Sequence, residues 1–175
     1  MQRLELTWIG KGQEPEIEPR ILLHDASKDY GDPNTENMLI HGDNLLALKA
    51  LEQQYAGQVK CIYIDPPYNT GEAFAEYNDN LEHSIWLGLM YSRLRLLKNL
   101  LAEDGVIFVQ LNDEEMNYCK VMMDEIFGRD NFINLIAVKT KNSSGASGGG
   151  EDRKLKKNTE FIICYGKSLF KKFYP

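Results

Sequence analysis

The feature that most limits the fold of this chain is a short apolar run that ends abruptly in an acidic residue and two prolines. Residues 59–64 read Val-Lys-Cys-Ile-Tyr-Ile, and Asp65-Pro66-Pro67-Tyr68 follows directly. A nearly continuous apolar run of this length is typical of a strand buried on both faces of a parallel sheet. Two consecutive prolines cannot continue such a strand, because proline has no backbone N–H. The run therefore predicts a strand that ends at Asp65.

Helical and strand patterns alternate along the rest of the chain. Apolar residues spaced by three and four positions predict an amphipathic helix over residues 81–101, which Glu103-Asp104-Gly105 should end. Further helices are expected from Gly42-Asp43-Asn44 and from Asn112, which forms a candidate capping box with Glu115. Further strands are expected at residues 37–41, 106–111, 132–140 and 159–165. This order predicts an α/β domain with a mostly parallel sheet and helices on both faces.

The size and composition of the chain favour one domain. A chain of 175 residues with 43% hydrophobic side chains can bury one ordinary core. Residues 1–36 are mixed and rich in Pro, Glu and Gly, so we expect an amino-terminal arm before a domain over residues 37–175. No apolar run approaches the roughly 20 residues that span a bilayer, and the first residues lack a secretory signal pattern. We expect a cytoplasmic protein without a membrane partner.

The cysteines and histidines suggest neither disulfides nor a metal. Cys61, Cys119 and Cys164 are odd in number, widely spaced and flanked by apolar residues, which favours buried free thiols. The three histidines show no metal-ligand spacing, so no metal site is expected.

The charge of the chain is unevenly distributed. The net charge of −6 is unfavourable for nucleic-acid binding, but residues 139–172 hold nine Lys/Arg and three Asp/Glu, a local +6 that leaves −12 elsewhere. This segment, with Lys139 and Lys141, is a candidate phosphate contact. A solvated surface loop is the alternative. Within it, the Gly/Ser-rich residues 142–150 predict a mobile loop.

The Asp65-Pro66-Pro67-Tyr68 segment has the groups needed to activate an exocyclic base amine. Such an amine is a poor nucleophile because its lone pair is delocalised into the ring. If the Asp65 carboxylate and the Pro66 carbonyl each accept one of its hydrogens, the lone pair can turn toward an electrophile. Tyr68 could stack on the base, which must first leave the duplex. A proline-rich strand exit without chemistry is the alternative.

These residues resemble a known family, the amino-methyltransferases of DNA, in the permuted class that places the catalytic motif before the cofactor glycine motif. The resemblance is strongest to modification subunits of type III restriction-modification systems and extends from about Leu4 to Lys167. The matching segments are His41–Leu48, Ile62–Gly71, Trp86, Leu94–Asp113, Glu125–Gly128 and Thr159–Tyr165.

The resemblance implies a Rossmann-like S-adenosylmethionine-dependent fold and methylation of adenine in double-stranded DNA, with Asp rather than Ser at the first motif position favouring adenine over cytosine. It assigns catalysis to Asp65, Pro66, Pro67 and Tyr68. Asp43 and Asn44 would hold the adenine of S-adenosylmethionine, while a helix N-cap role for either remains an alternative. Nucleic-acid contacts are expected at Tyr68, Asn69, Thr70, Lys139 and Lys141. A restriction subunit and self-association are expected partners of the full-length protein.

The chain departs from this family in one respect. The cofactor motif, aromatic-x-Gly-x-Gly after a strand, is absent, and the glycines of residues 144–150 precede Glu151-Asp152-Arg153-Lys154 instead of an apolar helix. We therefore expect an amino-terminal fragment with an incomplete fold that is inactive by itself. A catalytically inactive remnant that binds only DNA or a partner subunit, and a methyltransferase for RNA or a protein side-chain amide, are the alternatives.

Overall fold

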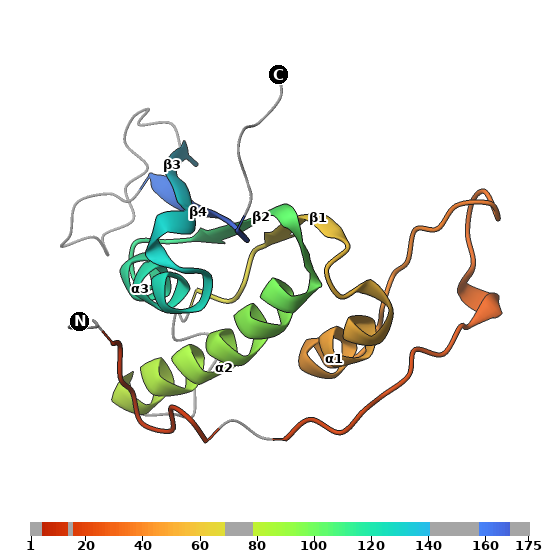
Figure 1. Ribbon diagram of the computed structural model, residues 1–175, viewed down its shortest axis with the longest axis horizontal. Coiled ribbons are helices and arrows are strands. Elements are labelled where there is room, and N and C mark those ends of the chain that lie inside the picture. The colour runs from red at the N-terminus through yellow and green to blue at the C-terminus, as the bar shows by residue number, and fades with distance from the viewer. Residues whose placement is uncertain (1–4, 14–15, 69–78, 141–157, 169–175) are drawn as a thin grey trace, which may run out of the picture.

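The computed structural model describes residues 5–13, 16–68, 79–140 and 158–168, and this part of the chain folds into one sheet with helices packed beside it (Figure 1). Two short 3-10 helices lie at Ala26–Lys28 and Arg129–Asn131. The described α-helices are α1 (Asn44–Tyr55), α2 (Asp79–Leu100) and α3 (Met116–Phe127), and the strands are β1 (Val59–Ile64), β2 (Leu101–Leu111), β3 (Phe132–Lys139) and β4 (Thr159–Gly166).

The described sheet has the order β1-β2-β4-β3 and is mixed. β1 and β2 are parallel, whereas β4 runs antiparallel to both of its neighbours. The α/β class is confirmed, but the expectation of a mostly parallel sheet is wrong for this part of the chain. The reason lies in the pairing of Lys139 with Thr159. This pairing makes β4 run antiparallel to β3. The apolar pattern of a strand does not encode the direction in which the strand runs.

The core lies between the sheet and α2 and α3. The predicted helical stripe is confirmed, since Leu87, Met90, Leu94, Leu97 and Leu101 are all buried. It packs on alternate strand residues, namely Ile62, Ile107, Val109, Leu111, Ile163 and Tyr165. In a strand, alternate side chains point to opposite faces, so these residues share one face of the sheet.

The opposite face of the sheet is more open than the sequence predicts. The described α-helices all lie on one side of the sheet in Figure 1, so helices on both faces are not found in this part of the chain. Tyr63 is 56% exposed, and Cys61 is also exposed. The prediction that all three cysteines are buried is therefore correct for Cys119 and Cys164 and wrong for Cys61. The cause is that β1 is an edge strand of the described sheet with one uncovered face.

The segment before α1 does not form its predicted strand. Residues 37–41 have no strand partner among the described residues, and Leu39 is 99% exposed. An apolar pattern gives a segment the propensity for a strand, but a strand forms only when a neighbour satisfies its backbone groups.

α1 begins as predicted, because the Asp43 carboxylate caps it by accepting hydrogen bonds from the amides of Leu45 (2.9 Å) and Leu46 (3.1 Å).

Two local expectations between α2 and α3 are corrected. β2 begins at Leu101, directly after α2, and includes Gly105. A Cβ at Gly105 would lie 2.8 Å from the Val59 carbonyl oxygen, so glycine permits close approach of β1. The capping box is also absent. The Asn112 side chain accepts from the Glu114 amide at 3.0 Å, and the Glu115 carboxylate bonds His83 Nδ1 at 3.0 Å instead.

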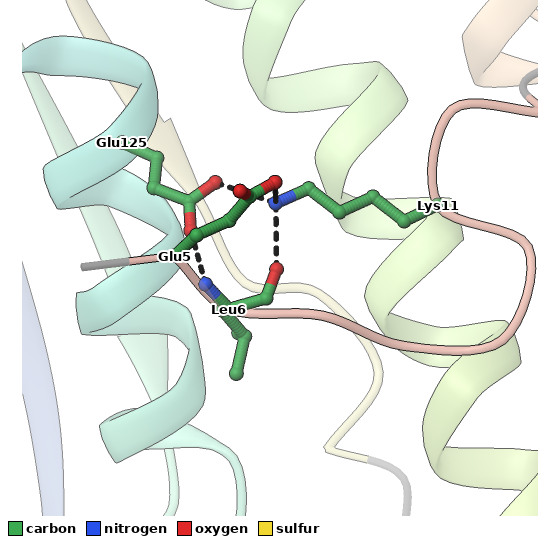
Figure 2. Close-up of polar contacts among 4 residues, drawn as sticks. All are labelled: Glu5, Leu6, Lys11 and Glu125. Carbon is green, nitrogen blue, oxygen red and sulfur yellow. Dashed lines mark hydrogen bonds and ion pairs between the residues drawn. The ribbon is translucent and has the colours of Figure 1, made fainter. Parts of the chain in front are cut away.

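The first described residues of the arm are fixed on α2 and α3. The Glu125 carboxylate of α3 accepts hydrogen bonds from the Leu6 amide and from Lys11 Nζ, the latter at 2.8 Å (Figure 2). Trp8 packs edge-on against Tyr91 with ring centroids 5.4 Å apart. Residues 16–43, by contrast, form a mostly exposed segment that extends past α1 and turns back to it, and the Arg20 carbonyl accepts a hydrogen bond from Gln53 of α1 at 3.3 Å (Figure 1).

Candidate functional site

The segment Asp65-Pro66-Pro67-Tyr68 forms one wall of a broad, open cavity. This segment follows the carboxyl end of β1, which lies beside the end of β2. Because β4 is antiparallel to β2, its first residues lie at the same edge of the sheet. The cavity has a volume of about 610 Å³ and is lined by Asp65, Pro66, Pro67, Tyr68, Gln110 and Glu160. Three strands thus contribute polar groups to one site.

The Tyr68 hydroxyl is held by side chains from the other two strands. It donates to Glu160 Oε2 at 3.1 Å and accepts from Gln110 Nε2 at 3.1 Å. Gln110 Nε2 also donates to Glu160 Oε2 at 2.6 Å, and its Oε1 accepts from the Tyr63 hydroxyl. Burial is the main cause that raises the pKa of Tyr68 far above its usual value; the hydrogen bond from Gln110 lowers it, and the nearby carboxylates of Asp65 and Glu160 raise it further. Tyr68 therefore stays protonated and neutral.

The proline loop is also fixed from the helix side. The indole Nε1 of Trp86, which is fully buried on α2, donates to the Pro67 carbonyl at 2.6 Å. Pro66 and Pro67 have no amide donors, so this part of the loop can be held by hydrogen bonds only through its carbonyls. The Pro67 carbonyl has its donor in Trp86, while Pro66 contributes to the wall of the cavity.

A second cavity adjoins the first and shares three of its lining residues. It lies between α1, β1 and α2, has a volume of about 400 Å³, and is lined by Asn44, Leu48, Tyr63, Ile64, Asp65, Pro66, Pro67, Leu89, Met90, Arg93 and Leu97. Asp65, Pro66 and Pro67 line both cavities. These residues are therefore placed where the contents of the two cavities would meet.

Arg93 links α2 to the start of α1 beside this second cavity. Its Nε donates to Asn44 Oδ1 at 2.6 Å, and its Nη1 donates to the Leu89 carbonyl at 3.0 Å. Burial lowers the pKa of Arg93, and the Asp43 carboxylate partly opposes that effect. Of the two residues predicted to contact a cofactor, Asn44 lines the cavity, whereas the Asp43 side chain caps α1.

The remaining predicted site residues are divided between described and undescribed parts of the chain. Lys139 is exposed at the end of β3, and its pairing with Thr159 puts it at the same sheet edge as Asp65. Asn69, Thr70, Lys141 and the predicted mobile loop at residues 142–150 lie outside the described residues.

The sequence did not predict the contacts made by four residues near the site, namely Trp86, Arg93, Gln110 and Glu160. Gln110 and Glu160 are polar residues next to a strand end, and each adjoins an apolar run, residues 106–109 in β2 and 161–164 in β4. That change from apolar to polar residues is a usable signal for a site at a sheet edge. Trp86 and Arg93 lie on the long amphipathic helix, and nothing in its spacing marks them as contacts of the proline loop or of Asn44.

Metal ligands and membrane-spanning helices are two further features that bear on function. Among the described residues, no cluster of three or more His, Cys, Asp or Glu side chains could hold a metal ion. None of the described helices is both long and apolar enough to cross a membrane.

Comparison with known families gives one match over most of the chain. The family described as DNA methylase matches residues 59–174, which include both β1 and the site residues of β2 and β4. Expectations from the resemblance in the sequence thus agree with an independent family match.

Curated relatives include subunits of restriction-modification enzymes. The protein of Haemophilus influenzae named Probable type III restriction-modification enzyme HindVI Mod subunit is 54% identical over 133 residues, which are 76% of this chain and 18% of that protein. The type III restriction-modification enzyme EcoPI Mod subunit of Escherichia phage P1 is 31% identical, covering 93% of this chain and 30% of that protein. The chain therefore spans less than a third of the length of these two relatives.

Solved structures share the fold at low sequence identity. TTHA0409 from Thermus thermophilus aligns with a TM-score of 0.55 and 16% identity, covering 77% of this chain and 55% of that one. The PvuII DNA methyltransferase, which is cytosine-N4-specific, aligns with a TM-score of 0.52 and 17% identity, covering 72% of this chain and 48% of that one. The expected Rossmann-like methyltransferase fold is confirmed, with the sheet directions corrected above.

Proposed function

The chain belongs to the DNA methylase family, and from that membership we propose that the protein transfers a methyl group from S-adenosylmethionine to the exocyclic amine of adenine in double-stranded DNA. The observation that carries this proposal is the pair of adjoining cavities that share Asp65, Pro66 and Pro67. A methyl transfer needs two ligands whose reacting atoms meet in line. One cavity would hold the methyl donor and the other the target base, with the proline loop between them.

The second cavity has the size and chemistry for part of such a cofactor. A volume of about 400 Å³ is within the usual range for small-molecule sites, which are largely apolar with a few polar groups. Leu48, Leu89 and Met90 provide apolar walls, and Asn44 and Arg93 provide polar groups. When bound there, S-adenosylmethionine would supply an electrophilic methyl group on its sulfonium. Asp43 and Asn44 are proposed to contact its adenine end.

The first cavity has acceptors and an aromatic ring for the target base. The Asp65 carboxylate and the Pro66 carbonyl would each accept a hydrogen bond from the target amine. The nitrogen lone pair could then turn out of conjugation with the ring and toward the methyl group. The neutral ring of Tyr68 would stack on the flipped base and replace part of the stacking that the base loses on leaving the duplex. Positioning and hydrogen bonding would do this work without a general base of unusual pKa, and the methylated nitrogen would release one of its hydrogens as a proton to water.

Adenine is proposed over cytosine because Asp stands at the first position of the Asp-Pro-Pro-Tyr motif. The same fold also supports amine chemistry on cytosine, since the structurally similar PvuII enzyme is cytosine-N4-specific. The identity of the methylated base is therefore an explicit outcome of the test below.

The proposed DNA contacts and partners extend beyond the described site. Lys139, together with Asn69, Thr70 and Lys141, would contact the nucleic acid. Because the curated relatives include Mod subunits of type III restriction-modification enzymes, we propose a restriction subunit as partner and self-association of the modification subunit. An enzyme that methylates cellular DNA would act in the cytoplasm.

The test is methyl transfer by the intact gene product that contains this chain. Purified protein, labelled S-adenosylmethionine and unmethylated genomic DNA are incubated, and the product is sequenced by a method that separates N6-methyladenine from N4-methylcytosine. We expect N6-methyladenine at one recurrent sequence. N4-methylcytosine would overturn the adenine assignment alone. Absence of any methyl transfer, with DNA binding retained, would instead support the catalytically inactive remnant.

A further inference from the structure

The hydrogen bonds around Tyr68 run in one direction and end on one carboxylate. The Tyr63 hydroxyl donates to Gln110 Oε1, which orients the Gln110 amide so that Nε2 faces Tyr68 and Glu160. Gln110 Nε2 and the Tyr68 hydroxyl both donate to Glu160 Oε2. Glu160 is therefore the acceptor at the end of the chain of hydrogen bonds, and its Oε2 accepts from both donors.

This arrangement uses the Tyr68 hydroxyl as both a donor and an acceptor. The hydroxyl donates to Glu160 and accepts from Gln110, which occupies its single hydrogen and one of its lone pairs. These two hydrogen bonds fix the position of the hydroxyl oxygen, and with it χ1 and the long axis of the ring. The oxygen lies on the χ2 axis, so rotation of the ring about that axis is restrained only by the preference of a phenol for hydrogen bonds near the ring plane. The direction of the Tyr68 ring is thus set by side chains of β2 and β4, two strands that lie outside the proline loop itself.

We propose that Glu160, oriented together with Gln110, is a positioning residue that fixes the Tyr68 ring as the platform for the target base. This inference rests on the proposed function. Glu160 acts through the Tyr68 hydroxyl, so it affects the geometry of the base more than the binding of the cofactor. Rigid support of the residues that touch a substrate is needed because small displacements of a reacting atom reduce the rate strongly.

A double-mutant cycle in the intact gene product tests the proposal. The variants are Glu160→Ala, Glu160→Gln, Tyr68→Phe and the double variant Glu160→Ala/Tyr68→Phe. The recognition sequence is first located by sequencing DNA methylated by the wild-type protein. Rates of methyl transfer are then measured in single turnovers with saturating cofactor and DNA, and both dissociation constants are measured separately. Glu103→Gln is the matched control, because the exposed Glu103 carboxylate pairs with Lys167 near the opposite end of β2.

We expect Glu160→Ala to slow methyl transfer about tenfold to a hundredfold, as loss of a hydrogen bond to a charged group does, with both dissociation constants changed less than about threefold. Glu160→Gln should recover most of the rate, because its amide oxygen can still accept from Tyr68. The double variant should be no slower than Tyr68→Phe, since Glu160 would then have no hydroxyl to hold. Glu103→Gln should match the wild-type protein.

Several outcomes would overturn the inference. If the effects of Glu160→Ala and Tyr68→Phe simply multiply, Glu160 does not act through Tyr68. If Glu160→Ala slows transfer only at temperatures where it unfolds, its role is in stability. A wild-type protein that transfers no methyl group to DNA would defeat the proposed function and this inference with it, whereas an active wild-type protein with a multiplicative cycle would defeat the inference alone.

Discussion

The buried indole Nε1 of Trp86 donates a 2.6 Å hydrogen bond to the Pro67 carbonyl, so the long helix α2 restrains the backbone of the proline loop. The same loop is also restrained through its Tyr68 side chain, whose hydroxyl accepts from Gln110 of β2 and donates to Glu160 of β4. A segment with two prolines has few backbone donors of its own. Its shape is therefore set by side chains from elements that are distant in the sequence.

The first prediction concerns Trp86. Trp86→Phe keeps an aromatic ring but removes the donor to Pro67, and we expect a loss of about 1–3 kcal/mol in the free energy of unfolding together with slower methyl transfer. Trp8→Phe is the matched control, because Trp8 Nε1 is buried and has no hydrogen-bond partner among the described residues. Denaturant unfolding and methyl-transfer rates decide. Equal effects of both substitutions on the rate would show that the Trp86 hydrogen bond does not support the loop.

The second prediction concerns Asp65. Asp65→Ala removes a proposed acceptor of the target amine, and we expect methyl transfer to fall about 10²- to 10³-fold. The dissociation constant of S-adenosylmethionine should change much less, because the proposed partner of Asp65 is the base. Calorimetry and single-turnover transfer separate the two quantities. Full activity of Asp65→Ala would end the catalytic assignment of this residue.

The third prediction separates two roles of Asp43. Asparagine caps helices about as well as aspartate, whereas alanine at an N-cap costs about 0.5–2 kcal/mol. We expect Asp43→Ala to destabilise the protein and Asp43→Asn to leave its stability nearly unchanged. If the carboxylate also contacts the cofactor, both variants should weaken S-adenosylmethionine binding. Wild-type cofactor affinity in Asp43→Asn would leave Asp43 with its capping role alone.

The fourth prediction is a pH dependence of the amino-terminal arm. Burial lowers the pKa of Lys11, but the hydrogen bonds and charges of Glu125 and Glu5 outweigh it and raise the pKa above its usual 10.5. The stabilisation from Lys11 is therefore fully present below pH 10.5 and is lost as the pH rises through the raised value.

Trp8 fluorescence and urea unfolding between about pH 9 and 12, a range that brackets the usual lysine pKa of 10.5, would follow this loss. Lys11→Met is the control, because it cannot titrate and should remove this part of the dependence. Identical pH profiles for wild type and Lys11→Met would show that the Lys11 and Glu125 contact does not hold the arm.

The fifth prediction concerns residues 1–175 by themselves. The glycine motif expected to contact the rest of the cofactor is absent from this sequence, so we expect weak binding of S-adenosylmethionine and no methylation of DNA. Loss of about 4 kcal/mol of binding would weaken the dissociation constant about a thousandfold relative to the intact gene product. Calorimetry on both proteins compares them directly. Tight binding by residues 1–175 would show that the cofactor pocket does not need the glycine motif.

The sequence by itself determined the features that depend on neighbouring residues. The spacing of apolar residues located α2 and its buried stripe, because a helix repeats every 3.6 residues. The prolines after Asp65 located the end of β1, and Asp43 marked the start of α1. The chemistry proposed for Asp65 and Tyr68 also follows from residues that are adjacent in the chain.

The tertiary structure alone decided which distant groups meet. Glu160 and Gln110 reach Tyr68 because β4 enters the sheet antiparallel to β2, and strand direction depends on pairing rather than on the pattern within a strand. The same is true of residues 37–41, whose strand-like pattern has no partner among the described residues. Cys61 is exposed because β1 lies at the edge of the described sheet, and an edge position is a property of the whole assembly of strands.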